Sequence, residues 1–416
     1  MIKALRGMND LFDEKAKLYT KIVQICEQVA KNYGYEFIET PKLEEMALFK
    51  RSVGESSDIV GKEMYEFSDK GGTSVCLRPE GTAGVVRAFI ENKFDRAGGV
   101  RKYYYFGSMF RYERPQKGRL REFHQFGVEC FGQGSVYEDA SVILMLNEIL
   151  KRLEIRTTLK INSLGDSECM PKYKEKLVRF LDTNKANLCE DCLRRIATNP
   201  IRVLDCKNEN CQKVLQNAPL ITENLNETCQ KDFEKLQVIL RENGVKFEVD
   251  AKLVRGLDYY CKTAFEFISD EIGSQSAVGG GGRYDRLVEF LGGRPTFGVG
   301  FAIGIERLME ILSLKEVKKE RDGVYICAMD EKYIDKVFAL GQELRKFIKT
   351  EISYEAKNLA KHLKNADAKE AKIFLCMGEN EAKKGELWCK NLVTKQEKMV
   401  KLSNIKTEIE KCMIMD

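Results

Sequence analysis

The chain has 416 residues, of which 43% are hydrophobic and 9% aromatic, and it carries a formal net charge of +5. A chain of this length exceeds one typical hydrophobic core, so two or three domains are expected. The small number of prolines, 7, argues against long disordered segments. The small net charge excludes recognition of nucleic acid by bulk charge alone, so evidence for such a partner must come from motifs.

The N-terminus and the cysteines bear on the compartment. Residues 1–7 lack the apolar region of a signal peptide, and no apolar run approaches the ~20 residues of a membrane span. Without an export signal, the 14 cysteines are expected to be reduced thiols and not a disulfide framework. The sequence therefore predicts a cytoplasmic protein with no membrane partner.

The first 165 residues alternate between helical and strand patterns. Apolar residues with helical spacing begin at Leu18, and Gly34 ends that pattern. Period-two alternation on both sides of a Pro/Gly loop predicts an antiparallel hairpin. The expected elements are a helix over 18–33, a strand over 35–38, hairpin strands over 103–110 and 122–131, a helix over 139–150 and a strand over 158–161.

The rest of the chain divides into three further parts. In residues 166–249, helical patterns rich in Lys and Glu replace strands, and strand patterns resume at 247–253 and 263–267. This predicts an insertion between two halves of one sheet. After a charged linker, buried strands flanking a helix predict a small α/β domain with parallel strands. The predicted domains are 1–165, 166–249, 250–314 and 322–416.

The loop of the hairpin carries several cationic residues and follows a strand that ends at Arg111. An arginine fixed at a strand end can hold a phosphate while loop cations contact a larger anionic partner. The run F-R-x-E-R-P-x-K-G-R, residues 110–119, resembles motif 2 of class II aminoacyl-tRNA synthetases, and its context is similar to the bacterial histidyl-tRNA synthetase family. The resemblance implies that Arg111 and Glu113 bind ATP. It makes Arg114 and Gln116 candidates for contacting the acceptor end of tRNA.

The resemblance to that family covers nearly the whole chain. It implies an α/β fold in which an antiparallel class II catalytic sheet is flanked by helices, carries a helical insertion and precedes a C-terminal α/β anticodon-binding domain. It implies a ligase that activates L-histidine with ATP and Mg²⁺ to histidyl-adenylate, then transfers histidine to the 3′ end of tRNA(His). Residues 34–44 resemble motif 1, so we expect a homodimer through residues 18–44. The alternative is an ordinary helix–turn–strand corner at Pro41.

Two segments place polar groups where an amino acid could bind. In the segment L-R-P-E-G-T, Glu80 and Thr82 can accept hydrogen bonds from an ammonium group, and the resemblance assigns them to the α-amino group of histidine. The alternative is a turn with a solvated Glu80. On the second hairpin strand, alternation puts Gln125 and Glu129 on one face and His124 on the other. The resemblance makes Gln125 an amino-group ligand and Glu129 an imidazole ligand, whereas His124 is expected to be a packed side chain.

Residues 253–260 resemble a signature that is specific to the histidine branch of class II enzymes. The resemblance places Arg255 near the substrate carboxylate and the α-phosphate, opposite Arg111. These two arginines are therefore the expected catalytic residues, since both reaction steps develop charge at that phosphate. Tyr259 and Tyr260 are expected to contact histidine. The alternative for Arg255 is a surface ion pair with Asp258.

The second half contains two more such segments. The glycines at 279–282 allow a backbone to approach a ligand closely, and the resemblance expects Tyr284, which follows them, to cover the imidazole. The alternative is a flexible surface turn. Residues 298–308 resemble motif 3, a strand followed by a helix, on which Arg307 would bind the γ-phosphate of ATP.

Four cysteines lie close together in the sequence of the middle block: Cys189, Cys192, Cys206 and Cys211. The spacing C-x₂-C followed by C-x₄-C is compatible with tetrahedral Zn²⁺. The block is equally compatible with packed helices whose thiols stay reduced and unligated. Both interpretations stay open at this point.

Other classes of nucleotide site are disfavoured. The chain has no G-x-x-x-x-G-K-[ST] loop, its glycines do not fit G-x-G-x-x-G, and its 2 histidines cannot form the histidine-rich signature of class I synthetases. One non-catalytic alternative is the synthetase-like regulatory subunit of a histidine-biosynthetic phosphoribosyltransferase, which typically lacks the anticodon domain. A histidine or tRNA sensor module of a larger chain is another.

Overall fold

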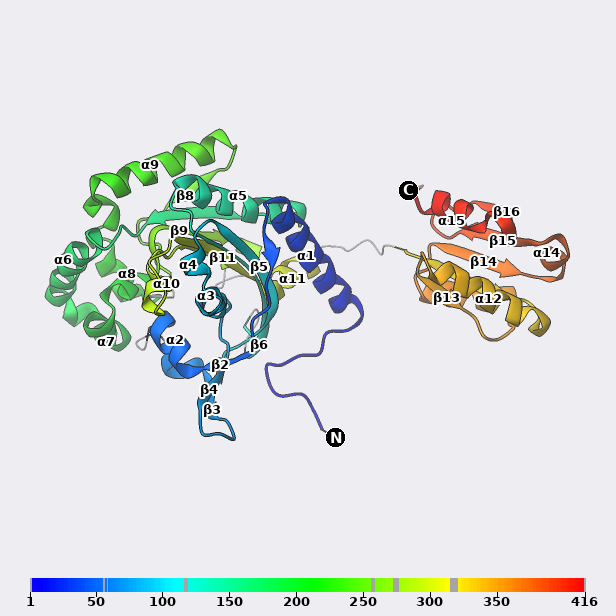
Figure 1. The fold of residues 1–416 in the computed structure, drawn as a ribbon, viewed down its shortest axis with the longest axis horizontal. Helices are drawn as coiled ribbons and strands as arrows, with labels where there is room; N and C mark the ends of the chain where they lie inside the picture. Colours follow the sequence, from blue (N-terminus) through cyan, green and yellow to red (C-terminus); the bar gives the residue numbers. More distant parts are fainter. Residues whose placement is uncertain are drawn as a thin grey trace. The chain divides into compact units, whose positions relative to one another are not determined.

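The computed structural model describes residues 2–54, 57, 59–115, 119–255, 259–271, 277–314 and 321–414. The chain forms two units, Met1–Lys315 and Glu316–Asp416 (Figure 1). Among the described helices, none combines the length and the apolar character needed to cross a bilayer.

Strands of the first unit belong to two sheets. In chain order they are β1 (Glu36–Phe37), β2 (Leu43–Glu45), β3 (Tyr65–Ser68), β4 (Ser74–Leu77), β5 (Arg101–Phe110), β6 (Glu122–Phe131), β7 (Thr158–Ser163), β8 (Phe247–Val249), β9 (Cys261–Ile268), β10 (Ala277–Arg283) and β11 (Gly298–Gly304). The large sheet has the order β1-β5-β6-β11-β10-β9-β7-β8, and β2-β4-β3 form a small one. The large sheet is antiparallel except for its two outer pairs, β1–β5 and β7–β8.

Helices cover both faces of the large sheet. They are α1 (Asp13–Asn32), α2 (Met46–Val53), α3 (Thr82–Glu91), α4 (Phe94–Ala97), α5 (Val136–Arg152), α6 (Cys169–Thr183), α7 (Glu190–Thr198), α8 (Glu209–Leu215), α9 (Glu227–Glu242), α10 (Leu287–Phe290) and α11 (Ile305–Ser313). Helices α1, α5, α9 and α11 share the main core with one face of the sheet. Helices α3 and α10 pack on the other face. Figure 1 shows α1, α5 and α9 around the outside of the curved sheet and α3 within the curve.

The alternation of the hairpin strands explains how they divide their side chains between these faces. On β6, Phe126 and Val128 are fully buried in the main core, whereas Phe131 belongs to the core around α3. On β5, Tyr104 faces the main core and its neighbour Tyr105 faces α3. Successive side chains of a strand point to opposite faces, so the alternation predicted for residues 122–131 is correct.

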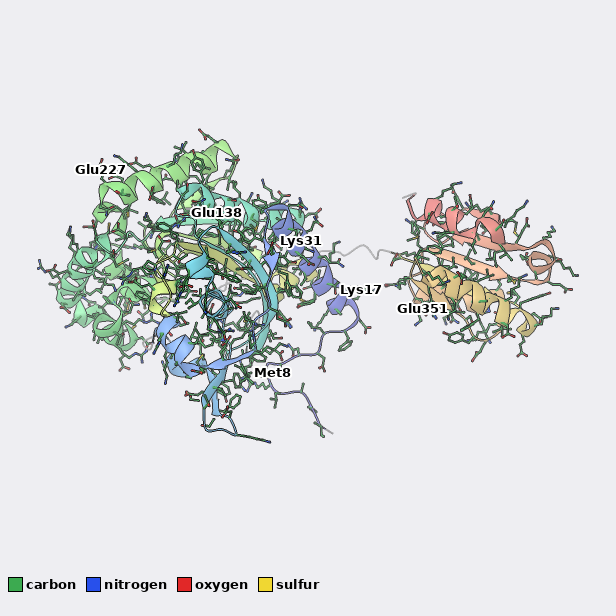
Figure 2. All side chains as sticks on the ribbon, viewed as in Figure 1. Met8, Lys17, Lys31, Glu138, Glu227 and Glu351 are labelled. Carbon is green, nitrogen blue, oxygen red and sulfur yellow. The ribbon has the colours of Figure 1, made fainter. Side chains whose placement is uncertain are left out.

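Helix α1 has the amphipathic character that the sequence predicted. Its residues Ile22, Cys26 and Val29 are fully buried. Lys17 and Lys31 lie on its solvent side and form ion pairs with glutamates three or four residues earlier (Figure 2). Gly34 follows the helix with φ +79°, a conformation that favours glycine and ends the helix.

The block between β7 and β8 contains a small core of its own. Helices α6, α7 and α8 and the short turns between them bury residues from Tyr173 to Ile221 against one another. Helix α9, in contrast, packs on α5 and contributes Phe233 and Leu236 to the main core. The helical content of this block agrees with the sequence, but its last helix packs with the large sheet of the first unit.

The second unit is a five-stranded sheet with helices. Its strands are β12 (Val324–Ala328), β13 (Thr350–Ile352), β14 (Ile373–Met377), β15 (Glu386–Asn391) and β16 (Glu397–Lys401). Its helices are α12 (Ile334–Arg345), α13 (Leu359–Ala368), α14 (Glu379–Lys384) and α15 (Ile405–Ile414). The sheet order is β13-β12-β14-β15-β16, and only the first three strands are parallel.

Two strand predictions need correction. The prediction of parallel strands in the second unit is correct for β12 and β14, but it missed β15 and β16, which pair antiparallel because the short turn between them cannot make the crossover that parallel strands require. The strand predicted to run to Leu253 ends at Val249. Asp250 ends it, since its backbone oxygen and side chain accept hydrogen bonds from Leu253 and Lys252 in a turn.

Candidate active site

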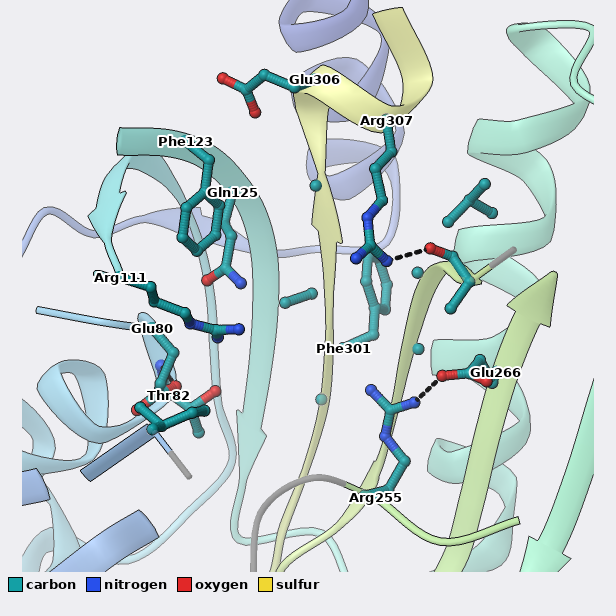
Figure 3. A pocket seen from close by; sticks show the side chains of 18 of the residues that line it. Glu80, Thr82, Arg111, Phe123, Gln125, Arg255, Glu266, Phe301, Glu306 and Arg307 are labelled. Atoms are coloured by element: carbon teal, nitrogen blue, oxygen red, sulfur yellow. Dashed lines mark hydrogen bonds and ion pairs between the residues drawn. The ribbon is translucent and has the colours of Figure 1, made fainter. Parts of the chain in front are cut away.

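A polar cavity of about 240 Å³ lies over the centre of the large sheet, on the face that carries α3. Strands β6, β11 and β10 form its floor, and the loop before α3 and the segment around Arg255 form its walls. Figure 3 shows charged side chains from these elements pointing into the space. The lining includes ten residues that the sequence predicted: Glu80, Thr82, Arg111, Glu113, Gln125, Glu129, Arg255, Tyr259, Tyr260 and Arg307.

Glu129 forms one end of the cavity and is almost completely buried. Its Oε1 accepts hydrogen bonds from the hydroxyls of Thr82 at 2.7 Å and Tyr105 at 3.3 Å, and its Oε2 accepts one from Tyr284. Burial raises the pKa of Glu129 to about 8, although the hydrogen bonds from Tyr284 and Thr82 act in the opposite direction. This carboxyl group is therefore fixed in orientation and takes up a proton easily near neutral pH.

Glu80 lies beside it at the N-terminus of α3. Its carboxylate accepts hydrogen bonds from the backbone N–H groups of Thr82 at 2.6 Å and Ala83 at 2.9 Å. Burial raises the pKa of Glu80, and these two backbone donors oppose the shift. The hydroxyl proton of Thr82 is directed to Glu129, so the lone pairs of its oxygen stay available to accept bonds from an ammonium group.

Three guanidinium groups point into the cavity from two facing sides, Arg111 from the side of Glu80 and Arg255 and Arg307 from the other (Figure 3). Arg111 donates from Nε to the carbonyl oxygen of Pro79 at 2.9 Å and stacks over the Phe123 ring. Arg255 forms an ion pair with Glu266 at 2.7 Å. Arg307, on α11, donates to the carbonyl oxygen of Ala277.

The positive charge of these arginines is only partly neutralised by Glu113 and Glu266. Burial lowers the pKa of Arg307, and the positive charges of Arg119 and Arg111 lower it further. Cations whose mutual repulsion is felt inside a partly buried cavity favour an anionic ligand. The arrangement fits a polyphosphate or another multiply charged anion.

Several buried polar atoms in the cavity lack a hydrogen-bond partner among the described residues. They are Oε1 of Gln125, the hydroxyl of Tyr259 and Nε of Arg255. An unpaired buried polar group is unfavourable, so atoms of this kind that line a cavity indicate a polar ligand that completes their hydrogen bonds.

Glycines make the space for these groups. A Cβ atom at Gly300 would lie 2.1 Å from Oε2 of Glu129, and one at Gly280 would lie 2.7 Å from Nη1 of Arg255. The glycine run 279–282 is therefore part of the central strand β10, and the alternative of a flexible surface turn is wrong. Any side chain at either position would displace a charged group of the site.

The remaining site residues have the following places. Tyr284 is buried behind Glu129 and does not line the cavity. His124 points away from Gln125, and its Nδ1 lies 2.7 Å from Oε1 of Glu306, which agrees with the predicted packing role. Arg114 is exposed to solvent. Gln116 and Asp258 lie outside the described residues, so the predictions that involve them remain predictions.

Sequence reasoning missed two functional neighbours. Tyr105 donates to Glu129 and pairs across the hairpin with Gly127, whose absent side chain leaves room for the tyrosine ring. The register of the predicted hairpin carries this signal, because a tyrosine opposite a glycine can lie across it. Glu266, the partner of Arg255, comes from β9, and no local pattern indicates that contact.

Comparison with known proteins gives the family. Residues 7–308 match the family model of histidyl-tRNA synthetase, and residues 323–412 match that of the anticodon binding domain. The chain belongs to the histidyl-tRNA synthetase family. Its predicted fold class, an antiparallel class II sheet followed by an α/β anticodon-binding domain, is thereby confirmed.

Individual members of the histidyl-tRNA synthetase family match along almost the whole chain. The histidine–tRNA ligase of Campylobacter hominis is 75% identical over 98% of this chain and 100% of its own length. That of Campylobacter fetus subsp. fetus is 72% identical with the same coverage. The crystal structure of apo S. aureus histidyl-tRNA synthetase matches with a TM-score of 0.81 and 34% identity, covering 98% of this chain and 99% of that one.

Proposed function

We propose that this protein is a histidine–tRNA ligase, which activates L-histidine with ATP and transfers it to tRNA(His). The observation that carries the proposal is one cavity lined both by a buried, fixed carboxyl group and by three guanidinium groups that point into it. The carboxyl group suits a small nitrogen heterocycle, and the guanidinium groups suit phosphates. Relatives named histidine–tRNA ligase, at 75% and 72% identity, support it.

Histidine would bind with its imidazole toward Glu129 and its ammonium group toward Glu80. Glu129 and Tyr260 would each contact one imidazole nitrogen, with Tyr259 beside the ring, while Tyr284 would hold Glu129 from behind and not cover the imidazole as the sequence predicted. The ammonium group would donate to Glu80, Thr82 and Gln125, which satisfies the unpartnered Oε1 of Gln125. The substrate carboxylate would then face the guanidinium groups of Arg111 and Arg255.

In the first step an oxygen of the histidine carboxylate would attack the α-phosphorus of ATP, and the bond to the bridging oxygen of pyrophosphate would break. Arg111 and Arg255 would stabilise the negative charge that develops on the α-phosphate, because both are held in place before the reaction. Arg307 would bind the γ-phosphate, and Glu113 the nucleotide. In the second step a hydroxyl of the terminal ribose of tRNA would attack the activated carbonyl carbon, and AMP would leave.

ATP reactions of this kind use Mg²⁺, which typically keeps several water and phosphate ligands and takes one or two carboxylates from the protein. The cavity lining offers Glu113 and Glu266, each of which is also paired with an arginine. These carboxylates fit a Mg²⁺ ion that arrives with the nucleotide. The ion would neutralise phosphate charge there.

Contacts with tRNA would involve both units. The match of residues 323–412 to an anticodon binding domain supports recognition of the anticodon by the second unit. Arg114 is exposed and follows Glu113, which lines the cavity, and we propose it, with Gln116, as a contact of the acceptor end. We retain 1–165, 166–249, 250–314 and 322–416 as the proposed domains, and the cytoplasm as the proposed location, which the free state of all 14 cysteines supports.

We also propose that the active form is a homodimer through residues 18–44. β1 is the edge strand of the large sheet, and a shallow groove beside it is lined by Tyr35, Phe37 and Phe106. Phe37 and Leu43 are each 48% exposed, which a second copy of the chain would cover. Sedimentation at micromolar concentration should give a dimer, and Phe37→Asp should give monomers. A wild-type protein that is monomeric and fully active contradicts this proposal.

The function is tested by ATP–pyrophosphate exchange with each of the twenty amino acids, followed by aminoacylation of tRNA transcripts. Histidine should support exchange at least about 10⁴-fold better than the others, because a site built for hydrogen bonds rejects ligands that leave them unpaired. Only tRNA(His) should be charged. Exchange with another amino acid, or none with any, overturns the proposal.

A further inference from the structure

The insertion block contains a second group of chemically reactive side chains, far in sequence from those that line the cavity. The sulfur atoms of Cys189, Cys192, Cys206 and Cys211 all lie within 4.8 Å of one another. None of the four lines the cavity of the candidate active site. All four are free thiols, and Cys189 and Cys206 have their sulfurs 3.8 Å apart.

This spacing matches a tetrahedral metal site. With Zn–S bonds of about 2.3 Å, the edges of a tetrahedron of sulfurs measure about 3.8 Å, so the observed pair needs almost no movement to share a Zn²⁺ ion. Thiols that merely fill a core have no reason to meet at one point. Four sulfurs around a common centre therefore favour ligation over the packing alternative.

The local backbone holds the four sulfurs in the way that a metal site requires. Cys189 is the N-cap of α7 and Cys192 lies in its first turn, where the helix dipole favours thiolates. Cys206 ends the 3₁₀ turn Pro200–Asp205, and Cys211 lies in α8. Backbone N–H groups donate to sulfur in two places, from Cys189 to Cys211 at 3.2 Å and from Asn208 to Cys206 at 3.4 Å.

A second sulfur-containing group serves as an internal comparison. Asp166, Cys169 and Cys229 also come within 4.8 Å of one another. However, Asp166 already accepts hydrogen bonds from the backbone of Glu168 and Cys169 and from the side chain of Asn226, so it caps a helix. That group therefore offers a metal ion only three ligand atoms, one of which is a carboxylate that already accepts several hydrogen bonds. The four-cysteine group offers four sulfur atoms, and a surface pocket beside Cys189 would let an ion reach them.

We propose that Cys189, Cys192, Cys206 and Cys211 bind one Zn²⁺ ion, which stabilises the insertion block. Four thiolates complete the tetrahedron and leave no open position for substrate or water, so the role is structural. The hydrophobic core of this block is small, so it stabilises the folded block only modestly. A bound metal ion would add to that stability. The site does not depend on the proposed aminoacylation function.

The first test is the metal content of protein that was purified in reducing buffer without chelator. Mass spectrometry of the elements should find one zinc per chain. Replacement of the zinc with Co²⁺ should give the intense absorption of a tetrahedral thiolate site. Cys206→Ser and Cys211→Ser should lose most of the zinc, whereas Cys229→Ser, the matched control from the other group, should keep it.

The second test separates a structural role from a catalytic one. Removal of zinc by a strong chelator should lower the melting temperature and increase protease cleavage within residues 166–226, while exchange activity of the protein that stays folded should change less than about threefold. Zinc near zero in the wild type, with no cobalt absorption and all four thiols freely titratable in the folded protein, overturns the proposal. Loss of exchange activity without loss of stability overturns the structural role.

Discussion

Glu129 and Asp139 are both buried carboxyl groups of the same unit, yet their surroundings are opposite. Asp139 is paired with the guanidinium of Arg283, accepts a hydrogen bond from Thr263 at 2.5 Å, and joins α5 to β10. The donors to Glu129 among the described residues are neutral hydroxyls, and a cavity opens in front of it.

The pKa shifts of the two carboxyl groups reflect this difference. Burial raises the pKa of Asp139 as well, but the charge and hydrogen bonds of Arg283 oppose that shift. Burial alone would lower the pKa of Arg283, but the Asp139 carboxylate raises it, so the pair stays charged and closed. Glu129 has no such cation, and burial raises its pKa to about 8. A buried acid with its own cation is a structural element. A buried acid without one, facing an open space, is suited to a ligand that brings an N–H donor or a positive charge.

The largest effect is expected on the structural side of this comparison. Asp139→Ala leaves the Arg283 guanidinium, which is 1% exposed, buried without its main counter-charge. Loss of one partner of a buried pair typically destabilises by about 3–5 kcal/mol. Urea unfolding of the first unit should show a decrease of that size.

The control for this prediction is a pair of the same chemistry on the surface. Glu175→Ala removes the partner of Arg179 on α6, where both side chains are more than half exposed, and should leave the unfolding midpoint almost unchanged. Equal effects of Glu175→Ala and Asp139→Ala would mean that the buried pair adds nothing beyond a surface contact.

A slightly smaller effect is expected from the loss of one of the cavity arginines. Arg255→Ala should lower the histidine-dependent ATP–pyrophosphate exchange rate about 10²–10³-fold, the usual loss when one preorganised donor to a developing charge is removed. The unfolding midpoint should change little, because Arg255 pairs with Glu266 at the cavity wall and not in the core. Exchange within threefold of the wild type would make Arg255 a simple ion-pair residue.

The sequence predicts the surroundings of Glu129 much better than it predicts the Asp139–Arg283 pair. Period-two alternation on β6 places Gln125 and Glu129 on the cavity face, and the resemblance of short segments identifies the arginines. The Asp139–Arg283 pair has no such signal, because its two residues are 144 positions apart and meet only when α5 packs on β10. The start of α5 was also placed too late, at residue 139, although Ser135 caps a helix that begins at Val136.

The contacts that were missed share one physical origin. Tyr105 contacts Glu129 because of the pairing register of β5 and β6. Glu266, on β9, contacts Arg255, which precedes that strand in the chain. Local propensity and alternation predict which face a residue occupies, but the partner on that face depends on how distant elements pack. Site composition is therefore more predictable than site geometry.

The next prediction concerns the ligand-binding side. Glu129→Gln keeps the size of the side chain but removes its ability to exchange a proton and adds an amide donor, so the KM for histidine should rise about 10–100-fold, the value of one strong hydrogen bond. ATP binding without histidine should be nearly unchanged, because Arg111 and Arg307 are untouched. Equal losses for both substrates would mean that Glu129 supports the sheet and does not select the amino acid.

The smallest expected effect is a pH dependence of histidine affinity. A bound imidazole and a fully ionised Glu129 together would leave a buried negative charge without a cation, which is unfavourable. The bound pair should therefore hold one proton in total. Between the imidazole pKa of about 6.5 and the Glu129 pKa of about 8, free histidine is neutral and free Glu129 is protonated, so binding neither takes up nor releases a proton and affinity is constant.

Outside that pH range, the direction in which affinity changes depends on which free partner has changed its protonation state. Below about 6.5, free histidine carries an extra proton that binding must release, so affinity falls as pH falls. Above about 8, free Glu129 is ionised and binding must take up a proton, so affinity falls up to about tenfold per pH unit as pH rises. Calorimetric titration of the wild type and of Glu129→Gln isolates the second limb, since ionisation of the α-amino group of histidine affects both proteins equally. A steady rise in wild-type affinity from pH 6.5 to 8 would instead show that Glu129 binds neutral imidazole as a bare carboxylate.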